Sequence, residues 1–163
     1  MITDFESVSF HDNAIHGFYL PENLNEGTSP LSFDIDHIIE WIDCSNSGRT
    51  IFSVCQGIIS FSDVTDLKIN IVWPNSNYSA SVVGLYILDI KRTIVKTHLR
   101  LPQYYRWEII TNNNNYHFSF GASSISMALI GDAKSIERQY LLGDERESIL
   151  QFIDNKPMLL IKS

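Results

Sequence analysis

The sequence predicts a mainly β protein, either an antiparallel β-sandwich or a partly open barrel, with one or two short C-terminal helices. Three observations lead to this prediction. Apolar and polar residues alternate along most of the chain, which is typical of strands that are buried on one face. Residues that favour turns divide the alternating stretches into about seven to nine strands. Helical spacing of apolar residues appears only towards the C-terminus.

Length and composition indicate a single domain that spans residues 1–163. A chain of 163 residues has the usual size of one domain, and its 44% of hydrophobic residues can fill one core. We find no internal repeat and no linker. Cys44 and Cys55 form no CxxC pair, so we expect free buried thiols and no zinc site.

The clearest strand runs from Leu31 to Trp41. We expect its apolar residues to face the core and its acids to face solvent, because side chains alternate between the two faces of a strand. The expected inward residues are Leu31, Phe33, Ile35, Ile39 and Trp41, with His37 as their one polar member.

Further strands are expected over Gln56–Phe61, Leu67–Trp73, Val82–Val95 and Ser124–Ile130. The connection between the first two would be Ser62–Asp66, and the third is long enough that Gly84 or Asp89 is expected to bulge or break it.

A β-hairpin is predicted where two aromatic, alternating segments flank a run of four asparagines. The strands would be Trp107–Thr111 and Tyr116–Phe120, with Asn112–Asn115 as the turn. Asparagine tolerates left-handed backbone angles and bonds to its own main chain, so the run favours a turn.

Near the C-terminus, the pattern predicts a helix that begins around Gly143. Asp144 would be its N-cap and Glu147 the partner in a capping box. The apolar stripe of this helix would consist of Ile149, Leu150 and Ile153. A second short helix is predicted over residues 133–142.

A first group of candidate site residues is His11, Asp12 and His16. Two imidazoles and a carboxylate suit zinc or non-haem iron. On a regular strand, however, His11 would face the opposite side from both Asp12 and His16, so metal binding would need a bulge or a turn. We therefore expect a structural turn, with Asp12 or Asn13 bonding local backbone amides, and no metal.

A second group of candidate site residues is Asp34, Asp36 and Glu40, which are expected to share one strand face. Their successive carboxylates would stand about 6 to 7 Å apart, a separation that overlaps the range of paired acid and base catalysts. Solvation of a strand face produces the same pattern and is the simpler interpretation. His37 is expected to be a hydrogen-bonded core histidine.

A third group of candidate site residues is an aromatic set that is expected to be exposed, Tyr104, Tyr105 and Trp107, beside Arg100 and Arg106. Tyrosine, tryptophan and arginine dominate the binding energy of many interfaces, so the group could line a site for a ligand or a protein. The rings could equally cover one end of the sandwich. Both interpretations remain open.

Charge and motifs narrow the range of functions. The formal charge of −7 is made of scattered acids, which argues against nucleic acid and tolerates a basic partner protein. No apolar run reaches the ~20 residues of a membrane span, and the N-terminal residues lack a secretory pattern, so we expect a cytoplasmic protein. The sequence contains no GxSxG, P-loop or GxGxxG motif.

We therefore expect a non-enzymatic domain without a cofactor that presents an acidic sheet face or a loop surface to another protein. The alternative is a metal- or ligand-binding protein or an enzyme that uses the first two groups of candidate residues. A small-ligand barrel is a third possibility, and it would need a deep apolar cavity.

Several segments also resemble an uncharacterised family of small bacterial all-β proteins. They are Phe10–His16, Phe33–Trp41, Ile59–Ile69, Trp107–Ile109 and Phe118–Ala122. Proteins of this size and type include immunity proteins that neutralise toxins. The resemblance thus implies a bacterial protein that is immunity-like or an adaptor.

Overall fold

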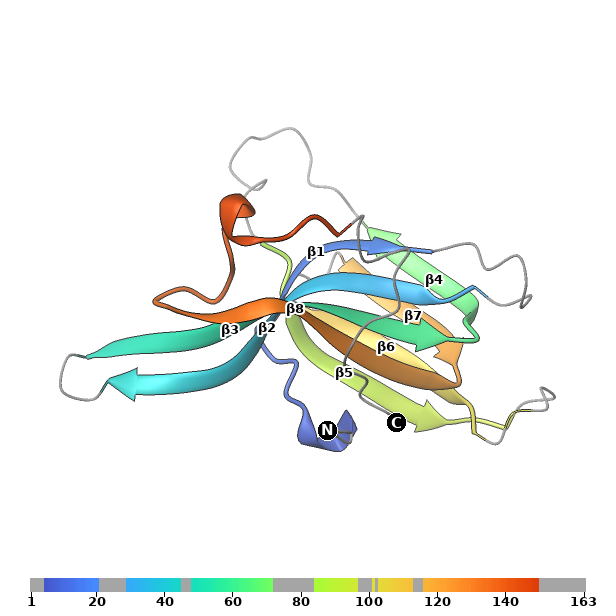
Figure 1. Cartoon of the computed structure of the whole chain (residues 1–163). Helices are drawn as coiled ribbons and strands as arrows, with labels where there is room; N and C mark the ends of the chain where they lie inside the picture. The colour runs from blue at the N-terminus through green and yellow to red at the C-terminus, as the bar shows by residue number, and fades with distance from the viewer. Residues whose placement is uncertain are drawn as a thin grey trace, which may run out of the picture.

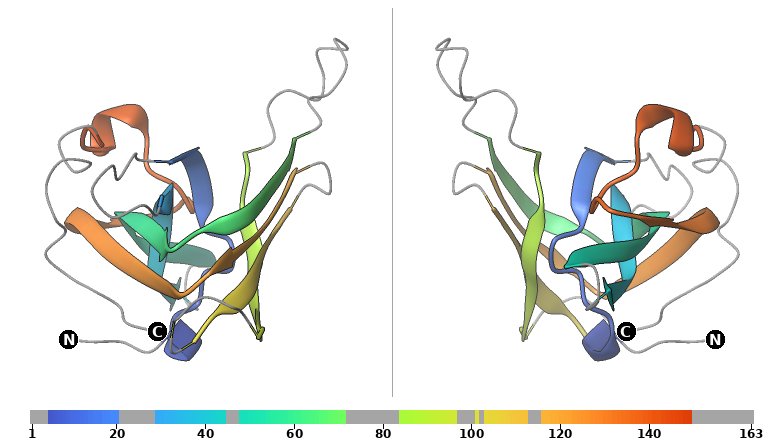
Figure 2. Two further views of the ribbon diagram at one scale, coloured as in Figure 1. Left: turned by 90° about the vertical axis from the view of Figure 1, so that its right-hand side faces the viewer. Right: turned by 90° about the vertical axis from the view of Figure 1, so that its left-hand side faces the viewer.

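The computed structural model describes residues 5–20, 29–44, 48–71, 84–96, 101, 103–112 and 116–149. These residues form two four-stranded antiparallel sheets, which Figures 1 and 2 show as two inclined layers. The sheets do not close into a barrel, so the predicted fold class is confirmed in its sandwich form. The first sheet has the order β1 (Ala14–Tyr19), β2 (Leu31–Cys44), β3 (Arg49–Ser62), β8 (Ser124–Ile136). The second has the order β4 (Thr65–Ile71), β7 (Tyr116–Ala122), β6 (Tyr105–Thr111), β5 (Ile87–Ile94).

The core lies between the two sheets and is rich in aromatic rings. The alternation at the start of β2 has the predicted direction, because Leu31, Phe33 and Ile35 are fully buried. Phe33 meets Phe118 of β7 edge to face, with 5.1 Å between the ring centroids. Such pairs add to the stabilisation that burial of the rings provides, and they fix the two sheets against each other.

The predicted hairpin is confirmed as β6 and β7. Trp107 pairs with Phe120, and Ile110 pairs with His117 next to the turn. Residues 113–115 of the asparagine run lie outside the described residues. The Trp107 side chain is fully buried, and its Nε1 donates a hydrogen bond to the Ala122 carbonyl at 3.2 Å. The hairpin therefore contributes a central part of the core.

The remaining predicted strands are present among the described residues, with bounds that differ from the prediction; residues 72–73 and 82–83 of the predicted strands lie outside the described residues. Residues 56–61 belong to the longer β3, and β4 is described from Thr65 to Ile71. The connection between them carries the chain from one sheet to the other. Asp63 in this connection and Asp66 at the start of β4 both adopt positive φ angles. In β5, the register shifts between Ile87 and Asp89, which agrees with the bulge expected in this strand.

The predicted helix over residues 133–142 is wrong. Residues 133–136 continue β8, where Lys134 pairs with Val54 and Ile136 with Phe52. The helical spacing of the apolar residues is overridden because the β3 edge supplies hydrogen-bond partners for this backbone. Residues 137–142 follow the strand without helical structure.

The helix predicted from Gly143 is reduced to one 3-10 turn, η2 (Gly143–Glu145), among the described residues. Its N-cap is Leu142 rather than Asp144, and the Glu145 carboxylate accepts the Leu142 N–H at 2.7 Å. Glu147 forms no capping box, since its backbone is bound elsewhere. Leu150 and Ile153 of the predicted stripe lie outside the described residues. A second single turn, η1 (Phe5–Ser7), lies near the N-terminus.

The far ends of β2 and β3 project from the sandwich as a hairpin, which Figure 1 shows running out beyond the second sheet. We call residues 39–44 of β2 and 49–53 of β3 the arm. The register shifts between Ile38 and Glu40, so Ile39 is a bulge. Contrary to the predicted inward direction, Ile39 is 48% exposed and Trp41 53% exposed. The bulge shifts the alternation by one residue, so Trp41, which pairs with Phe52, lies on the outer face of the first sheet and not on the face that meets the second sheet.

Candidate functional site

The chain that follows β8 crosses the outer face of the first sheet, as the orange and red segment of Figure 1 shows. We call residues 137–149 the strap. The Gln56 side chain binds the backbone of Glu147 twice, with Oε1 accepting its N–H at 2.8 Å and Nε2 donating to its carbonyl at 3.2 Å. Leu141 packs on Ile38 and Val54. The strap therefore covers much of the face that was expected to meet solvent.

Asp36 is the central residue beneath the strap and is fully buried. Its Oδ2 accepts hydrogen bonds from His16 Nε2 at 2.7 Å and from the Leu141 N–H at 2.8 Å. Its Oδ1 accepts from Arg146, whose guanidinium also binds Asp34. A buried carboxylate needs such partners, because its removal from water is otherwise very costly. The four residues Asp34, Asp36, His16 and Arg146 form what we call the strap network.

The charge state of His16 follows from its place in the strap network. Burial, and next the positive charge of Arg146, lower the pKa of the His16 imidazole. The ring is therefore neutral at neutral pH, and its Nε2–H is the donor to Asp36. Both oxygens of Asp36 are engaged by donors of the protein itself, which makes the network suited to holding the strap rather than to acid–base catalysis.

The predicted acidic face is thus wrong in two respects. Asp36 is fully buried and the Asp34 side chain is only 14% exposed, because the strap lies over them. Glu40 lies on the opposite face of β2, since Ile38 pairs with Val54 and Glu40 with the next residue, Ser53. The bulge at Ile39 breaks the alternation on which the shared face was based.

A second polar pair, Asn13 and His37, lies in the interior. Asn13 Nδ2 donates to His37 Nδ1 at 2.9 Å, and Asn13 Oδ1 accepts the Ile38 N–H at 3.0 Å. Burial lowers the pKa of His37 to about 4, so the ring is neutral and carries its proton on Nε2. The expectation of a hydrogen-bonded core histidine is confirmed.

The segment that holds His11 and Asp12 forms a turn, as expected. The Asn13 N–H bonds to the Phe10 carbonyl, and Asp12 has a φ of 63°. The backbone amide that the Asn13 side chain binds is nevertheless that of Ile38 in β2, and not a local amide as expected. Asp12 Oδ2 accepts a hydrogen bond from Gln139 of the strap at 3.2 Å, which adds a further attachment.

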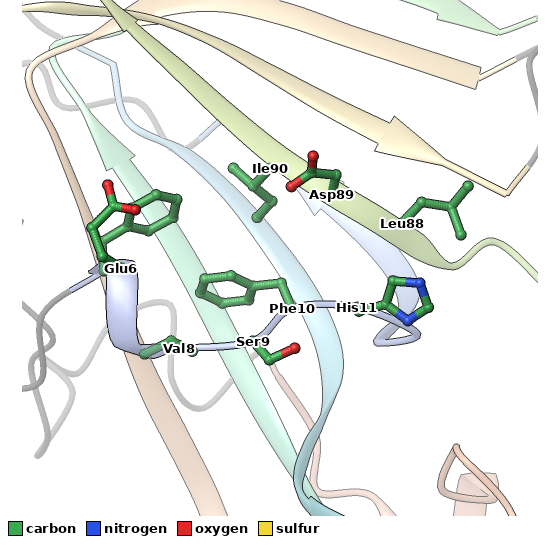
Figure 3. Close-up of a pocket in the computed structure, with 9 residues that line it drawn as sticks. Glu6, Val8, Ser9, Phe10, His11, Leu88, Asp89 and Ile90 are labelled. Atoms are coloured by element: carbon green, nitrogen blue, oxygen red, sulfur yellow. The ribbon is translucent and has the colours of Figure 1, made fainter.

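The structure does not gather the first group of candidates around one site. His16 joins the strap network, whereas His11 is 59% exposed and lines an open pocket of about 200 Å³ (Figure 3). Phe10 and Leu88 are among the other residues of this pocket. Among the described residues, no group of three or more His, Cys, Asp or Glu side chains could hold a metal ion.

The three aromatic candidates take separate structural roles. Contrary to the expected exposure, Trp107 is in the core, and Tyr104 is buried with its hydroxyl bonded to Thr65 Oγ1 at 2.7 Å. The half-buried Tyr105 ring contacts the guanidinium of Arg92, which also stacks on Phe5. These contacts favour the interpretation that the rings cover part of the sandwich. Arg100 lies outside the described residues.

The arm is the surface that sequence analysis missed. The Trp41 ring leans on Phe52 edge to face at 5.1 Å and leaves about half of its surface to solvent. Within the described part of the chain, the exposed acids Glu40 and Asp43 have no ion pair, whereas Arg49 binds Glu137 at 2.9 Å. The alternating pattern predicted the wrong direction for the Trp41 side chain. An unusually long strand with an aromatic residue near its end was nevertheless a signal that could have indicated the projecting arm.

Comparisons of the chain with family models, with curated proteins and with solved structures found no match. In the portion described by the structure, no helix has the length and apolar character required to cross a membrane. The class that the fold and site define is therefore an antiparallel two-sheet sandwich with a strapped outer face and a projecting arm.

Proposed function

We propose that this chain is a non-enzymatic protein-binding domain, immunity-like or an adaptor, that binds a basic partner protein through its arm. The observation that carries the proposal is the exposure of Ile39 and Trp41 on a hairpin that leaves the sandwich. Apolar side chains grouped on a projecting element and rimmed by charge are typical of interaction surfaces. Tryptophan is among the residues that contribute most binding energy in interfaces.

Charge supports a basic partner. The chain carries a formal charge of −7, and the arm adds two exposed acids, Glu40 and Asp43, next to its apolar residues. Such a field attracts a basic protein over long range and speeds its association. A partner surface with Lys or Arg around an apolar centre would match both the acids and the apolar residues of the arm.

The polar clusters support binding rather than catalysis. Asp36, the most buried acid of the candidate sites, is bound by His16, Arg146 and a backbone amide. His37 is bound by Asn13 and has a pKa of about 4, far from that of a base poised for neutral pH. Their donors and acceptors hold the fold together.

The proposal is tested by capture of a partner on immobilised protein, with Trp41→Ala compared to wild type. We expect Trp41→Ala to weaken the captured partner's affinity by about 30-fold, the effect of losing a hot-spot side chain worth about 2 kcal/mol. Binding is measured by surface plasmon resonance. Raising the salt from about 50 to about 500 mM should slow association with the wild type.

The matched control is Ile94→Ala, since Ile94 is 68% exposed on β5, at the edge of the second sheet. This variant should bind the partner as the wild type does. A partner whose affinity drops with Ile94→Ala but is unchanged with Trp41→Ala would place the binding surface away from the arm and contradict the proposal.

A further inference from the structure

The outer edge of β2 in the arm has no neighbouring strand among the described residues. On one side β3 pairs with β2 as far as Cys44. On the other side β1 pairing ends at Asp36, and the Asn13 side chain takes the N–H of Ile38. In an antiparallel ladder, alternate residues direct their N–H and C=O groups away from the paired strand. Within the described part of the chain, alternate residues of 40–43 therefore offer unpaired backbone groups along an open edge.

The side chains along this edge follow the order acid, apolar, apolar, acid, as Glu40, Trp41, Ile42 and Asp43. Trp41 and Asp43 share the face of Phe52, whereas Glu40 and Ile42 lie on the opposite face, next to Ser53 and Ile51. Each face of the edge thus presents one apolar residue beside one acid. A strand added along this edge would meet the same mixture on both of its faces.

A second copy of the arm is a poor occupant of this edge. If two copies paired in register over residues 40–43, Glu40 would lie opposite Asp43 in the antiparallel arrangement and opposite another Glu40 in the parallel one. Like charges directly opposite each other destabilise a pair of strands. The acids therefore disfavour self-pairing and favour a basic strand.

We propose that residues 40–43 of β2 bind an extended segment of the partner as an added β-strand, and that this segment has the order basic, apolar, apolar, basic. The inference rests on the proposed function and specifies its mode of recognition. Backbone hydrogen bonds would supply affinity, as in other cases of strand addition, and the side chains would supply specificity. The basic residues would lie opposite Glu40 and Asp43, and the apolar residues opposite Trp41 and Ile42.

The test uses a synthetic peptide with the core Lys-Val-Val-Lys, flanked by Ser and Thr and blocked at both ends. We expect it to bind the full chain and to slow amide hydrogen exchange of residues 40–43 at least ten-fold at saturation, as measured by NMR. A peptide with Glu in place of both Lys residues should not bind. The double variant Glu40→Gln, Asp43→Asn should bind the Lys peptide at least ten-fold more weakly.

Two controls separate this mode of binding from simple charge attraction. A Lys-Val-Val-Lys peptide with alternate backbone nitrogens methylated keeps its side chains and charge but loses donors, so it should bind at least ten-fold more weakly. The variant Asp89→Asn, Glu108→Gln removes two exposed acids from the second sheet and should bind like the wild type. Amide spectra of all variants verify that the fold is retained.

Equal binding of the methylated and unmethylated peptides would overturn strand addition while leaving a side-chain surface on the arm. Absence of binding by the Lys peptide would also overturn it. Neither result decides the proposed function, which the Trp41→Ala capture experiment tests on its own.

Discussion

Arg146→Ala should lower the free energy of unfolding by about 3 to 5 kcal/mol, the usual cost of leaving one member of a buried ion pair without its partner. The Arg146 side chain is only 11% exposed and binds both Asp34 and Asp36. Its removal leaves the carboxylate of Asp36 fully buried without its cation. Urea denaturation at neutral pH, followed by circular dichroism, measures the loss.

The matched control for this prediction is Arg49→Ala. Arg49 is likewise an arginine that binds a carboxylate, that of Glu137 at 2.9 Å. In this pair, however, both side chains are more than 60% exposed. Exposed pairs contribute about 0 to 1 kcal/mol, because water solvates both partners when the pair is broken. If both variants lost the same small amount of stability, Arg146 would not hold the strap in the way the structure indicates.

Acidification from pH 7 to pH 4 should cost about 3 kcal/mol of stability through His37 alone. Burial lowers the pKa of His37 from 6.5 to about 4 in the folded state. The unfolded chain therefore binds the proton first, and stability is complete above pH 6.5 and falls as the pH drops towards 4. Each pKa unit corresponds to about 1.4 kcal/mol. The lowered pKa of His16 acts in the same direction.

The measurement is a series of urea denaturation curves across this pH range for the wild type and His37→Gln. Glutamine removes the titrating group and retains an oxygen that can accept from Asn13, so the variant should show a shallower dependence on pH. His11→Gln is the control, because the His11 ring is 59% exposed. A wild type as stable at pH 4 as at pH 7 would contradict the buried, neutral state of His37.

Much of the sandwich can be predicted from local pattern. The hairpin around the asparagine run and the inward set Leu31, Phe33 and Ile35 follow from alternation and turn chemistry, which act between neighbouring residues. The prediction was wrong where the structure depends on an interaction between residues far apart in the sequence. Ile136 falls at helical spacing with Tyr140 and Leu141, yet residues 133–136 pair with β3 about 80 positions earlier in the chain, and this pairing decides their structure.

In the candidate site, too, local features could be predicted from the sequence and contacts between residues far apart in the sequence could not. His16 and Asp36 were singled out by residue type, and the structure brings them together. Arg146 was missed because it lies 110 positions from Asp36 and belongs to no local motif. The directions of Glu40 and Trp41 were wrong because a single bulged residue, Ile39, shifts the strand alternation, and hydrophobicity does not report a bulge.

Photo-crosslinking from the arm is the most direct test of the proposal that the arm binds a basic partner protein. A benzophenone amino acid is placed at position 41 in the full chain within cells, and separately at position 94 on the second sheet as a control. From this proposal we expect position 41 to form a covalent adduct with a basic protein and position 94 to form none. Glu40→Gln with Asp43→Asn should reduce the adduct. Adducts from position 94 and none from position 41 would contradict it.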